Sequence, residues 1–393
     1  MAETLNIPPA PVNFTGNPIR IEIGCDIAGA TVSNLMVICV IRVYSGEAAT
    51  VVATARREVV NGGARFNLQS YLTREHVASF SYPTALKGIN HADWLGRFDI
   101  QFYSTYLDTS TGATVTSETQ TSDVYRFIEG GISKQQEIIL GLAGKSVWQW
   151  MIDEKKFLNQ YPALMPVSET TPLRLFWINR AGNTNCRVKV KKYYTSGAAA
   201  VEAETINQTS GDYEAVEVVL DPNVVFSNAS DRAAISKFEV WLSDGTNVIS
   251  EVHSFTLLHT YFERNYYFLF LESLGGFSSA WARGYAEKGG EISKQSWAKD
   301  LPWVPSATTS ELFSSRGSIG KKIKSDFGYL DTEAEQDFIT DFLASEKVFV
   351  VDGTRVWPVV IDGGQFTSWD DLADILPRPF EWQLAFADSY LTK

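Results

Sequence analysis

The chain has 393 residues, of which 45% are hydrophobic and 20% charged, and its 34 Lys and Arg against 46 Asp and Glu give a net charge of −12. This composition excludes an intrinsically disordered or collagen-like chain. Because so acidic a protein repels phosphate groups, we expect it to bind no nucleic acid and no anionic membrane surface.

Aromatic residues make up 13% of the chain, which favours β-structure. The three cysteines, Cys25, Cys39 and Cys186, are too few for a disulfide framework, and we expect buried free thiols. The first residues lack the basic and apolar pattern of a signal peptide, which predicts a protein made in the cytoplasm of a cell. No apolar run reaches the length of a membrane span, so we expect no membrane insertion.

Short alternating strands separated by turn residues dominate the first part of the chain. An apolar strand surrounds Cys39, and the pair Asn61 and Gly62 marks a tight turn. Residues 97–102 then alternate between apolar and polar side chains, which is typical of a strand with one buried face. This spacing of strands and turns predicts a β-sandwich.

The same order of features returns in residues 171–242. The matching features are Pro18 and Pro172, the strands near Cys39 and at 187–191, the turns at 61–63 and 210–213, and the strands at 97–102 and 238–242. Four matches in one order indicate an internal repeat. We therefore predict two tandem β-sandwich-like domains, residues 1–165 with a linking segment and residues 166–304.

Residues 305–393 have a different pattern. Thr332 and Glu335 have the spacing of a capping box at the start of a short amphipathic helix. Asp352 and Gly353 separate two apolar runs, which predicts a hairpin, and a last strand follows at 380–386. The fold class we expect is therefore mainly β, with two sandwiches followed by a small α+β domain at 305–393.

The sequence contains no strong catalytic or metal-binding motif. Its histidines are not at metal-ligand spacing; they are His76, His91, His253 and His259. The neighbours Asp370 and Asp371 could act as glycosidase acids, but adjacent acids in an acidic chain are interpreted as solvated turn residues. We predict no enzyme, no cofactor and no metal.

Tryptophan is the residue type in this chain best suited to contact a ligand or a partner, because an indole ring can stack on a sugar or pack into a protein interface. The candidates for such contacts are Trp94, Trp148, Trp150, Trp281 and Trp303. Most tryptophans in a β-sandwich belong to the core, and this is the competing interpretation.

Several short strings resemble the tail-associated (tail-tip or baseplate) structural proteins of phages and prophages of Bacteroidota. They are residues 17–19, 127–132, 148–150, 158–162, 266–277, 342–345 and 357–361. Where the family has an Asn-x-Leu-Gly-Gly turn after an aromatic strand, this chain has Glu272 in place of the Asn. The resemblance implies a viral protein without catalysis, located in the virion.

The resemblance also implies the partners: other virion tail proteins and copies of the chain itself, as a trimer or hexamer. The alternative is a carbohydrate-binding or adhesion protein that recognises a cell-surface glycan through exposed tryptophans. A glycan-cleaving enzyme is a third hypothesis, and it requires two carboxylates that converge in one cleft.

Overall fold

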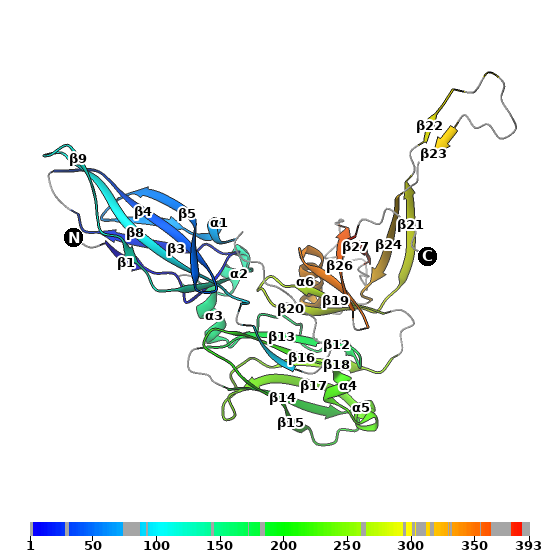
Figure 1. Ribbon diagram of the computed structural model, residues 1–393. Helices are drawn as coiled ribbons and strands as arrows, with labels where there is room; N and C mark the ends of the chain where they lie inside the picture. Colours follow the sequence, from blue (N-terminus) through cyan, green and yellow to red (C-terminus); the bar gives the residue numbers. More distant parts are fainter. Residues whose placement is uncertain are drawn as a thin grey trace.

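The computed structural model describes residues 3–27, 31–73, 87–91, 93–142, 145–171, 173–180, 185–260, 265–293, 296–300, 303, 312–314, 318–328, 330, 332–353, 355–362 and 379–386. Strands predominate, and they form two β-sandwiches followed by a unit that combines a sheet with a helix (Figure 1). This arrangement confirms the predicted fold class. None of the helices within these ranges is long and apolar enough to cross a membrane.

The first sandwich packs a small sheet against a large one. The small sheet has the order β1 (Glu3–Ile7), β3 (Arg20–Cys25) and β6 (Gly63–Asn67), and the short helix α1 (Gln69–Leu72) follows it. The large sheet has the order β2 (Val12–Phe14), β11 (Tyr125–Ile128), β8 (Gly96–Asp108), β4 (Val32–Ser45) and β5 (Ala48–Glu58), and β9 (Ala113–Thr116) and β10 (Gln120–Thr121) also pair with β8. Phe98, Ile100 and Phe102 point into the core, as their alternation predicts.

The large sheet of the second sandwich has the same strand order as the large sheet of the first. It contains β12 (Met165–Ser168), β18 (His253–Leu258), β17 (Ile235–Ser243), β14 (Asn185–Tyr194) and β15 (Val201–Thr209). The small sheet of the second sandwich contains β13 (Leu173–Ile178), β16 (Ala215–Leu220) and β7 (Lys87–His91), and two short helices, α4 (Pro222–Val225) and α5 (Ala229–Ala234), precede β17. In both large sheets the first two strands are parallel, which confirms the repeat. The three cysteines are buried free thiols, as predicted.

Strand β7 joins the two sandwiches. It lies between β6 and β8 in the sequence, yet it pairs with β16 of the second sandwich from Lys87 to His91. Two helices, α2 (Lys134–Ile139) and α3 (Val147–Asp153), follow β11 and lie beside the first sandwich (Figure 1). Both begin at a serine whose side chain accepts a hydrogen bond from a backbone N–H of the first turn, which fixes where each helix starts.

The third unit is a seven-stranded sheet that curls around one helix. The sheet has the order β20 (Phe277–Ala282), β19 (Tyr266–Leu271), β25 (Val348–Asp352), β26 (Arg355–Asp362), β27 (Pro379–Leu384), β24 (Ser318–Asp326) and β21 (Ala286–Ser293). The helix is α6 (Glu333–Ala344), and its capping box between Thr332 and Glu335 is present as predicted. The hairpin at Asp352 and Gly353 is confirmed by the pairing of β25 with β26.

The strand pairing differs from the predicted division at residues 304 and 305. Strands β19, β20 and β21 precede that point but belong to the same sheet as the C-terminal strands. The physical reason is the apolar character of β19 on both faces. Phe268 and Phe270 pack on α6, while Leu269 packs in the cluster on the opposite face. A strand that is apolar on both faces needs a central position with cover on each side.

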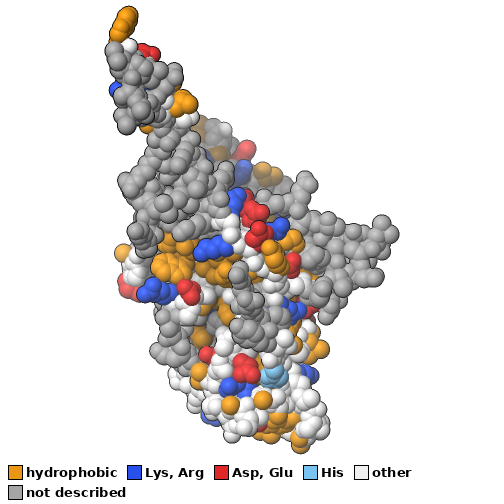
Figure 2. Space-filling model, turned by 90° about the vertical axis from the view of Figure 1, so that its right-hand side faces the viewer, with side chains coloured by type: hydrophobic (Ala, Val, Ile, Leu, Met, Phe, Trp, Pro, Cys, Tyr) orange, Lys and Arg blue, Asp and Glu red, His pale blue; other side chains and the backbone are white. Residues whose placement is uncertain are grey.

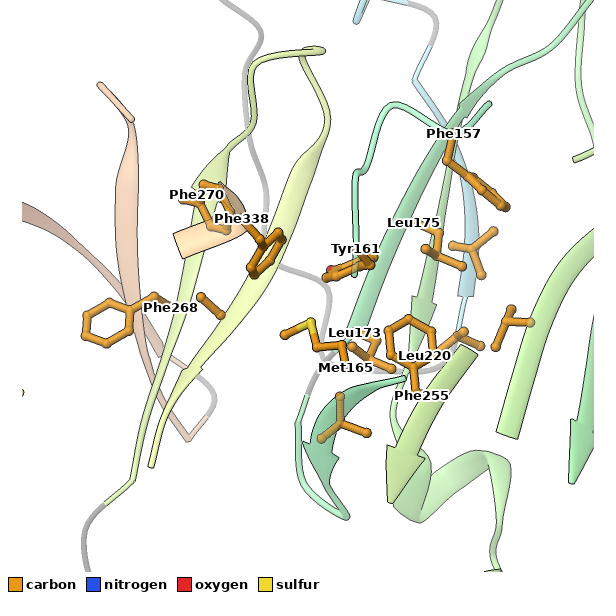
Figure 3. Packing of buried hydrophobic residues seen from close by; sticks show 14 of the residues in the cluster. Phe157, Tyr161, Met165, Leu173, Leu175, Leu220, Phe255, Phe268, Phe270 and Phe338 are labelled. Carbon is orange, nitrogen blue, oxygen red and sulfur yellow. The ribbon is translucent and has the colours of Figure 1, made fainter. Parts of the chain in front are cut away.

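The second sandwich and the third unit share one hydrophobic core. Figure 3 shows Tyr161 and Met165 between the sandwich residues and the aromatic residues that surround α6. The ring centroids of Tyr161 and Phe338 are 5.5 Å apart, and those of Phe270 and Phe338 are 5.2 Å apart. The first sandwich has a core of its own, and a third cluster lies where the three units meet.

Candidate functional site at the junction of the three units

The five predicted tryptophans occupy three kinds of environment. Trp94, Trp148 and Trp281 are buried and pack in the interior, and Trp148 and Trp281 also line small pockets. Trp150 is half-buried on α3, and Trp303 is fully exposed. The structure therefore leaves Trp150 and Trp303 accessible for contact, and these two residues belong to different sites.

Backbone segments of the first and third units meet at what we call the junction, formed by residues 128–132, 157–162 and 272–277. The N–H of Gly131 donates to the carbonyl of Ser273 at 2.5 Å, and the indole N–H of Trp94 donates to the carbonyl of Gly275 at 3.1 Å. A Cβ on Gly130 would lie 2.6 Å from the carbonyl oxygen of Ser273, so only glycine permits this approach.

Three of the strings that carried the family resemblance therefore meet at one place. Residues 127–132, 158–162 and 266–277 are far apart in the sequence, and the junction joins them. Side chains add to the contact, since Lys347 Nζ lies 2.5 Å from Glu129 Oε2. In this chain these three segments form contacts that hold the units against one another.

Two buried carboxyl groups lie in the third unit's part of the junction. Glu272 Oε2 accepts a hydrogen bond from the N–H of Gln160 at 2.6 Å, and Asp341 Oδ2 accepts one from the N–H of Ser273 at 2.9 Å. Burial raises the pKa of Glu272 well above its usual value, and burial also raises the pKa of Asp341. Both carboxyl groups are thus held by backbone donors, and burial disfavours their charged forms.

An open cavity of about 410 Å³ lies beside these residues. We call it the junction cavity, and all three units line it. Helices α2 and α3 contribute Gln136, Ile139 and Trp150; residues 156–163 with Glu251 and His253 form a second wall; and Leu274 and Ala334 belong to the third unit. Its volume is in the range of sites that bind small ligands, about 300–1,000 Å³.

The charged groups of the junction cavity neutralise one another. Lys156 Nζ donates to Glu251 Oε2 at 2.6 Å, and Glu251 Oε1 accepts a hydrogen bond from the N–H of Phe157 at 2.9 Å. His253 is 6% exposed, and its Nε2 lies 3.9 Å from Glu251 Oε1, beyond hydrogen-bonding distance. Burial lowers the pKa of His253 to about 3, so its ring is neutral at physiological pH.

Three polar atoms of the junction cavity have no partner among the described residues. His253 Nε2 is buried and makes no hydrogen bond. Gln136 uses its Oε1 to accept from the N–H of Ser133, which leaves its Nε2 as a donor. Gln160 uses its Nε2 to donate to Ser273 Oγ at 3.1 Å, which leaves its Oε1 as an acceptor. The cavity thus offers an aromatic surface, a donor, an acceptor and a neutral imidazole.

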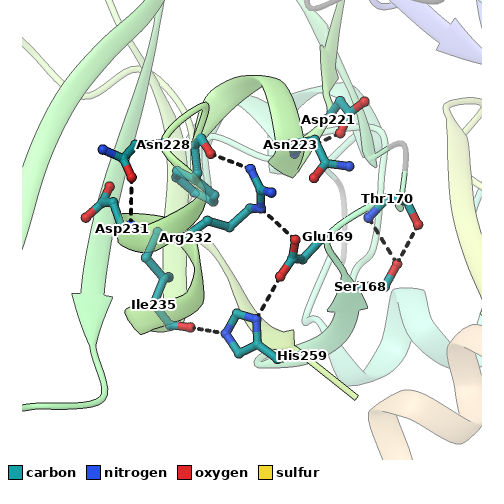
Figure 4. A network of polar contacts seen from close by, with 11 residues as sticks. Ser168, Glu169, Thr170, Asp221, Asn223, Asn228, Asp231, Arg232, Ile235 and His259 are labelled. Carbon is teal, nitrogen blue, oxygen red and sulfur yellow. Dashed lines mark hydrogen bonds and ion pairs between the residues drawn. The ribbon is translucent and has the colours of Figure 1, made fainter. Parts of the chain in front are cut away.

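A second polar cluster, on the second sandwich, is fully paired. Figure 4 shows Glu169 between His259 and Arg232. His259 Nδ1 lies 3.0 Å from Glu169 Oε1, its Nε2 lies 2.8 Å from the carbonyl oxygen of Ile235, and Arg232 Nε donates to Glu169 Oε2 at 2.6 Å. His259 first, and Arg232 second, lower the pKa of Glu169. The cluster attaches α5 to the strands beside it.

The remaining groups considered from the sequence have structural roles or lie outside the described residues. His91 binds the buried Glu217 at 2.7 Å, and Arg174 forms an ion pair with the same carboxylate. His76, Asp370 and Asp371 lie outside the described residues. Within the described part of the chain, no group of three or more His, Cys, Asp or Glu side chains could hold a metal ion.

The second accessible tryptophan belongs to a projecting arm. We define the arm as β22 (Ser296–Ala298), β23 (Leu312–Ser314) and Trp303; its two strands pair with each other and extend beyond the ends of β21 and β24 (Figure 1). Trp297 is 52% exposed and Leu312 is 70% exposed. Hydrophobic side chains are visible at the upper end of the molecule in Figure 2.

The sequence identified Trp150 but missed the rest of the junction cavity. Its other polar residues, Gln136, Gln160, Glu251 and His253, come from separate segments and form no motif. The only local signal is the spacing of Glu251 and His253, which are two residues apart near the start of a strand. That spacing places two side chains on one face of a strand, but it says nothing about what lies opposite.

Comparison with known proteins identifies no family for this chain. No protein-family model matches the chain, and no curated protein matches it in sequence. Among solved structures, the chain is similar to the crystal structure of CBD12 from CALX1.2, with 8% sequence identity and a TM-score of 0.16. That match covers 59% of this chain and 76% of the other. A TM-score of this size does not support the transfer of a function.

Proposed function

We propose that this protein is a structural component of a phage or phage-derived tail, at the tail tip or baseplate, where it assembles symmetrically with copies of itself and with other virion proteins. The observation that carries the proposal is the arm. Trp303 is fully exposed at a place where the described chain offers nothing to cover it. Exposed apolar side chains of this kind mark protein interfaces in soluble proteins.

The energetics of the arm support an interface role. A two-stranded ribbon is marginally stable in water unless it packs against something else. Tryptophan is also among the residues that contribute most binding energy in protein interfaces. We therefore assign the arm to contact with a second copy of the chain. If every copy both gives and receives an arm, the contacts are heterologous, and such contacts form a ring when the rotation between copies closes.

The two large sheets provide further surfaces for assembly. Each ends in a long strand, β5 in the first sandwich and β15 in the second, whose outer edge pairs with no other strand among the described residues, and most residues of both strands are exposed. Exposed edges of this length are a liability for a monomer, because they pair readily with another chain. In an assembly they are available for contacts with neighbouring subunits.

The self-assembly part of the proposal is tested by light scattering coupled to size exclusion over a concentration series. We expect a discrete oligomer, a trimer or a hexamer. The variant W297S/W303S/L312S should have the mass of a monomer, whereas the control V224S/V248S, which changes exposed valines away from the arm, should keep the wild-type mass. A wild-type monomer at every concentration would overturn self-assembly, and an arm variant that keeps an oligomeric wild-type mass would overturn the role of the arm.

The virion part of the proposal needs a separate measurement. Particles purified from cells that encode the chain are analysed by mass spectrometry, with a known capsid protein as the reference for particle recovery. We expect the chain at a fixed ratio to the other tail proteins. Intact particles that lack it would refute the assignment to a tail, even if the purified protein forms oligomers.

A further inference from the structure

We propose that the junction cavity binds the ring of a neutral sugar, stacked on Trp150. Gln136, Gln160 and His253 supply the hydrogen bonds to its hydroxyl groups. This inference does not depend on the assembly proposal, because the cavity lies within one copy of the chain and away from the arm.

The state of His253 points to a polar ligand. Its ring lines the junction cavity, and its Nε2 is buried with no hydrogen-bond partner among the described residues. A buried polar atom without a hydrogen bond costs about 1–3 kcal/mol. A ligand that fills the cavity with apolar atoms alone would leave this nitrogen unpaired, whereas a hydroxyl group at the same place pairs with it.

The charges of the cavity favour an uncharged ligand. Lys156 and Glu251 form an ion pair at 2.6 Å, and the second oxygen of Glu251 binds a backbone N–H, so neither residue offers a free charge. The buried His253 ring is neutral at physiological pH because burial disfavours its protonated form. An anionic or cationic sugar would therefore enter without a counter-charge.

The remaining groups match the chemistry of a pyranose. A hydroxyl group both donates and accepts, so it can bind the free Nε2 of Gln136 as well as the free Oε1 of Gln160. The apolar face of a sugar ring packs on an aromatic side chain, and Trp150 on α3 is the half-buried indole that lines the cavity. Both types of contact are thus present within one cavity.

The test uses the full-length protein and four neutral disaccharides: maltose, lactose, cellobiose and N,N′-diacetylchitobiose. Binding is measured by isothermal titration calorimetry and by saturation-transfer NMR, with 3′-sialyllactose as the anionic probe. We expect saturable binding of at least one neutral disaccharide in the millimolar range or tighter. W150A should weaken it by at least about tenfold, which corresponds to ~1.4 kcal/mol, while the control Y71A removes an exposed aromatic ring that does not line the cavity and should leave the affinity unchanged.

A second variant protects the test against misfolding of W150A. Q160A alters an exposed side chain and should weaken binding without changing the circular dichroism spectrum. Three results would overturn the proposal: no saturable binding by any of the four neutral disaccharides, an affinity that neither W150A nor Q160A changes, or a clear preference for 3′-sialyllactose. The oligomeric state of the same samples is measured independently and bears only on the assembly proposal.

Discussion

Replacing Gly130 by alanine should weaken the junction more than a substitution at an ordinary turn glycine. Gly130 has a φ of +141°, a conformation that side chains rarely adopt. A Cβ there would lie 2.6 Å from the carbonyl oxygen of Ser273 and 2.9 Å from the backbone nitrogen of Gly275. Both contacts are with backbone, so no side chain can rotate away to relieve them.

The size of the effect is the sum of two costs. An unfavourable backbone conformation costs about 1–3 kcal/mol, and overpacking of a well-packed site costs about 1–3 kcal/mol more. We therefore expect G130A to lower the free energy of unfolding by about 2–6 kcal/mol. Gly46 provides the matched control, because its φ is +60° and a Cβ there would meet nothing within 4 Å. G46A should show only the conformational cost, about 1–2 kcal/mol.

The assay is urea-induced unfolding followed by tryptophan fluorescence. Trp94 reports on the junction directly, since its indole N–H binds the carbonyl of Gly275. Limited proteolysis of the same variants measures whether residues near the junction become accessible under native conditions. If G130A and G46A differ by less than about 0.5 kcal/mol, which is the usual size of a surface effect, the close backbone approach at Gly130 contributes nothing to stability.

Three further substitutions test buried and half-buried charges. Because burial raises the pKa of Glu272, the folded protein holds the proton of this carboxyl group more tightly than the unfolded chain, and stability falls as the pH rises above 4.5. E272Q should therefore be more stable than wild type in urea melts at pH 8, and this advantage should shrink toward pH 4.5. An advantage that is constant with pH would contradict the prediction. E217Q removes the carboxylate that forms an ion pair with the buried Arg174 and should cost about 3–5 kcal/mol, whereas R174M/E217L should recover most of that loss in the same melts. Equal losses would contradict the role of the ion pair. His259 and Arg232 lower the pKa of Glu169, so E169Q should reduce the free energy of unfolding by about 1 kcal/mol or less near pH 7. This loss should vanish as the pH falls below 4.5. A loss that persists at low pH would indicate a packing effect instead.

The repeat could be predicted because its signals are local. Turn residues such as Asn61 and Gly62 adopt positive φ values of 52° and 79°, which sets the tight turn before β6. The alternation from Phe98 to Phe102 decides which face of β8 is buried. Each of these features acts over a few residues, and their order along the chain is preserved in the second sandwich. The helix α6 was predictable for the same reason, since a capping box needs only Thr332 and Glu335.

The partners of the strands could not be predicted in this way. Alternation indicates that a segment is a strand, but it does not indicate which other strand it joins. The pairing of β7 with β16 and of β19 with β25 therefore had no signal in the sequence. The junction cavity depends on such long-range pairings, because Gln136 and His253 approach one another only after the three units are in place. Trp94 and Trp281 are buried for the same reason.

The two small sheets differ in the character of their outer faces. Arg20 on β3 corresponds to Arg174 on β13, and Glu22 corresponds to Phe176. The members of each pair are 154 residues apart, as are Pro18 and Pro172. In the first sandwich Arg20 is exposed and Glu22 pairs with the exposed Arg65 at 2.6 Å, so this face meets solvent.

In the second sandwich every residue of β13 is buried, and Phe176 packs against Trp94 with ring centroids 4.8 Å apart. The outer face of β13 therefore needs cover, which Trp94 and the junction residues, among them Phe277, provide. A run of six buried residues in a strand indicates cover on both faces, so the difference between the copies was already visible in the sequence of β13. The outer face of the small sheet is polar in the first sandwich and apolar in the second. The other two units pack on this apolar face.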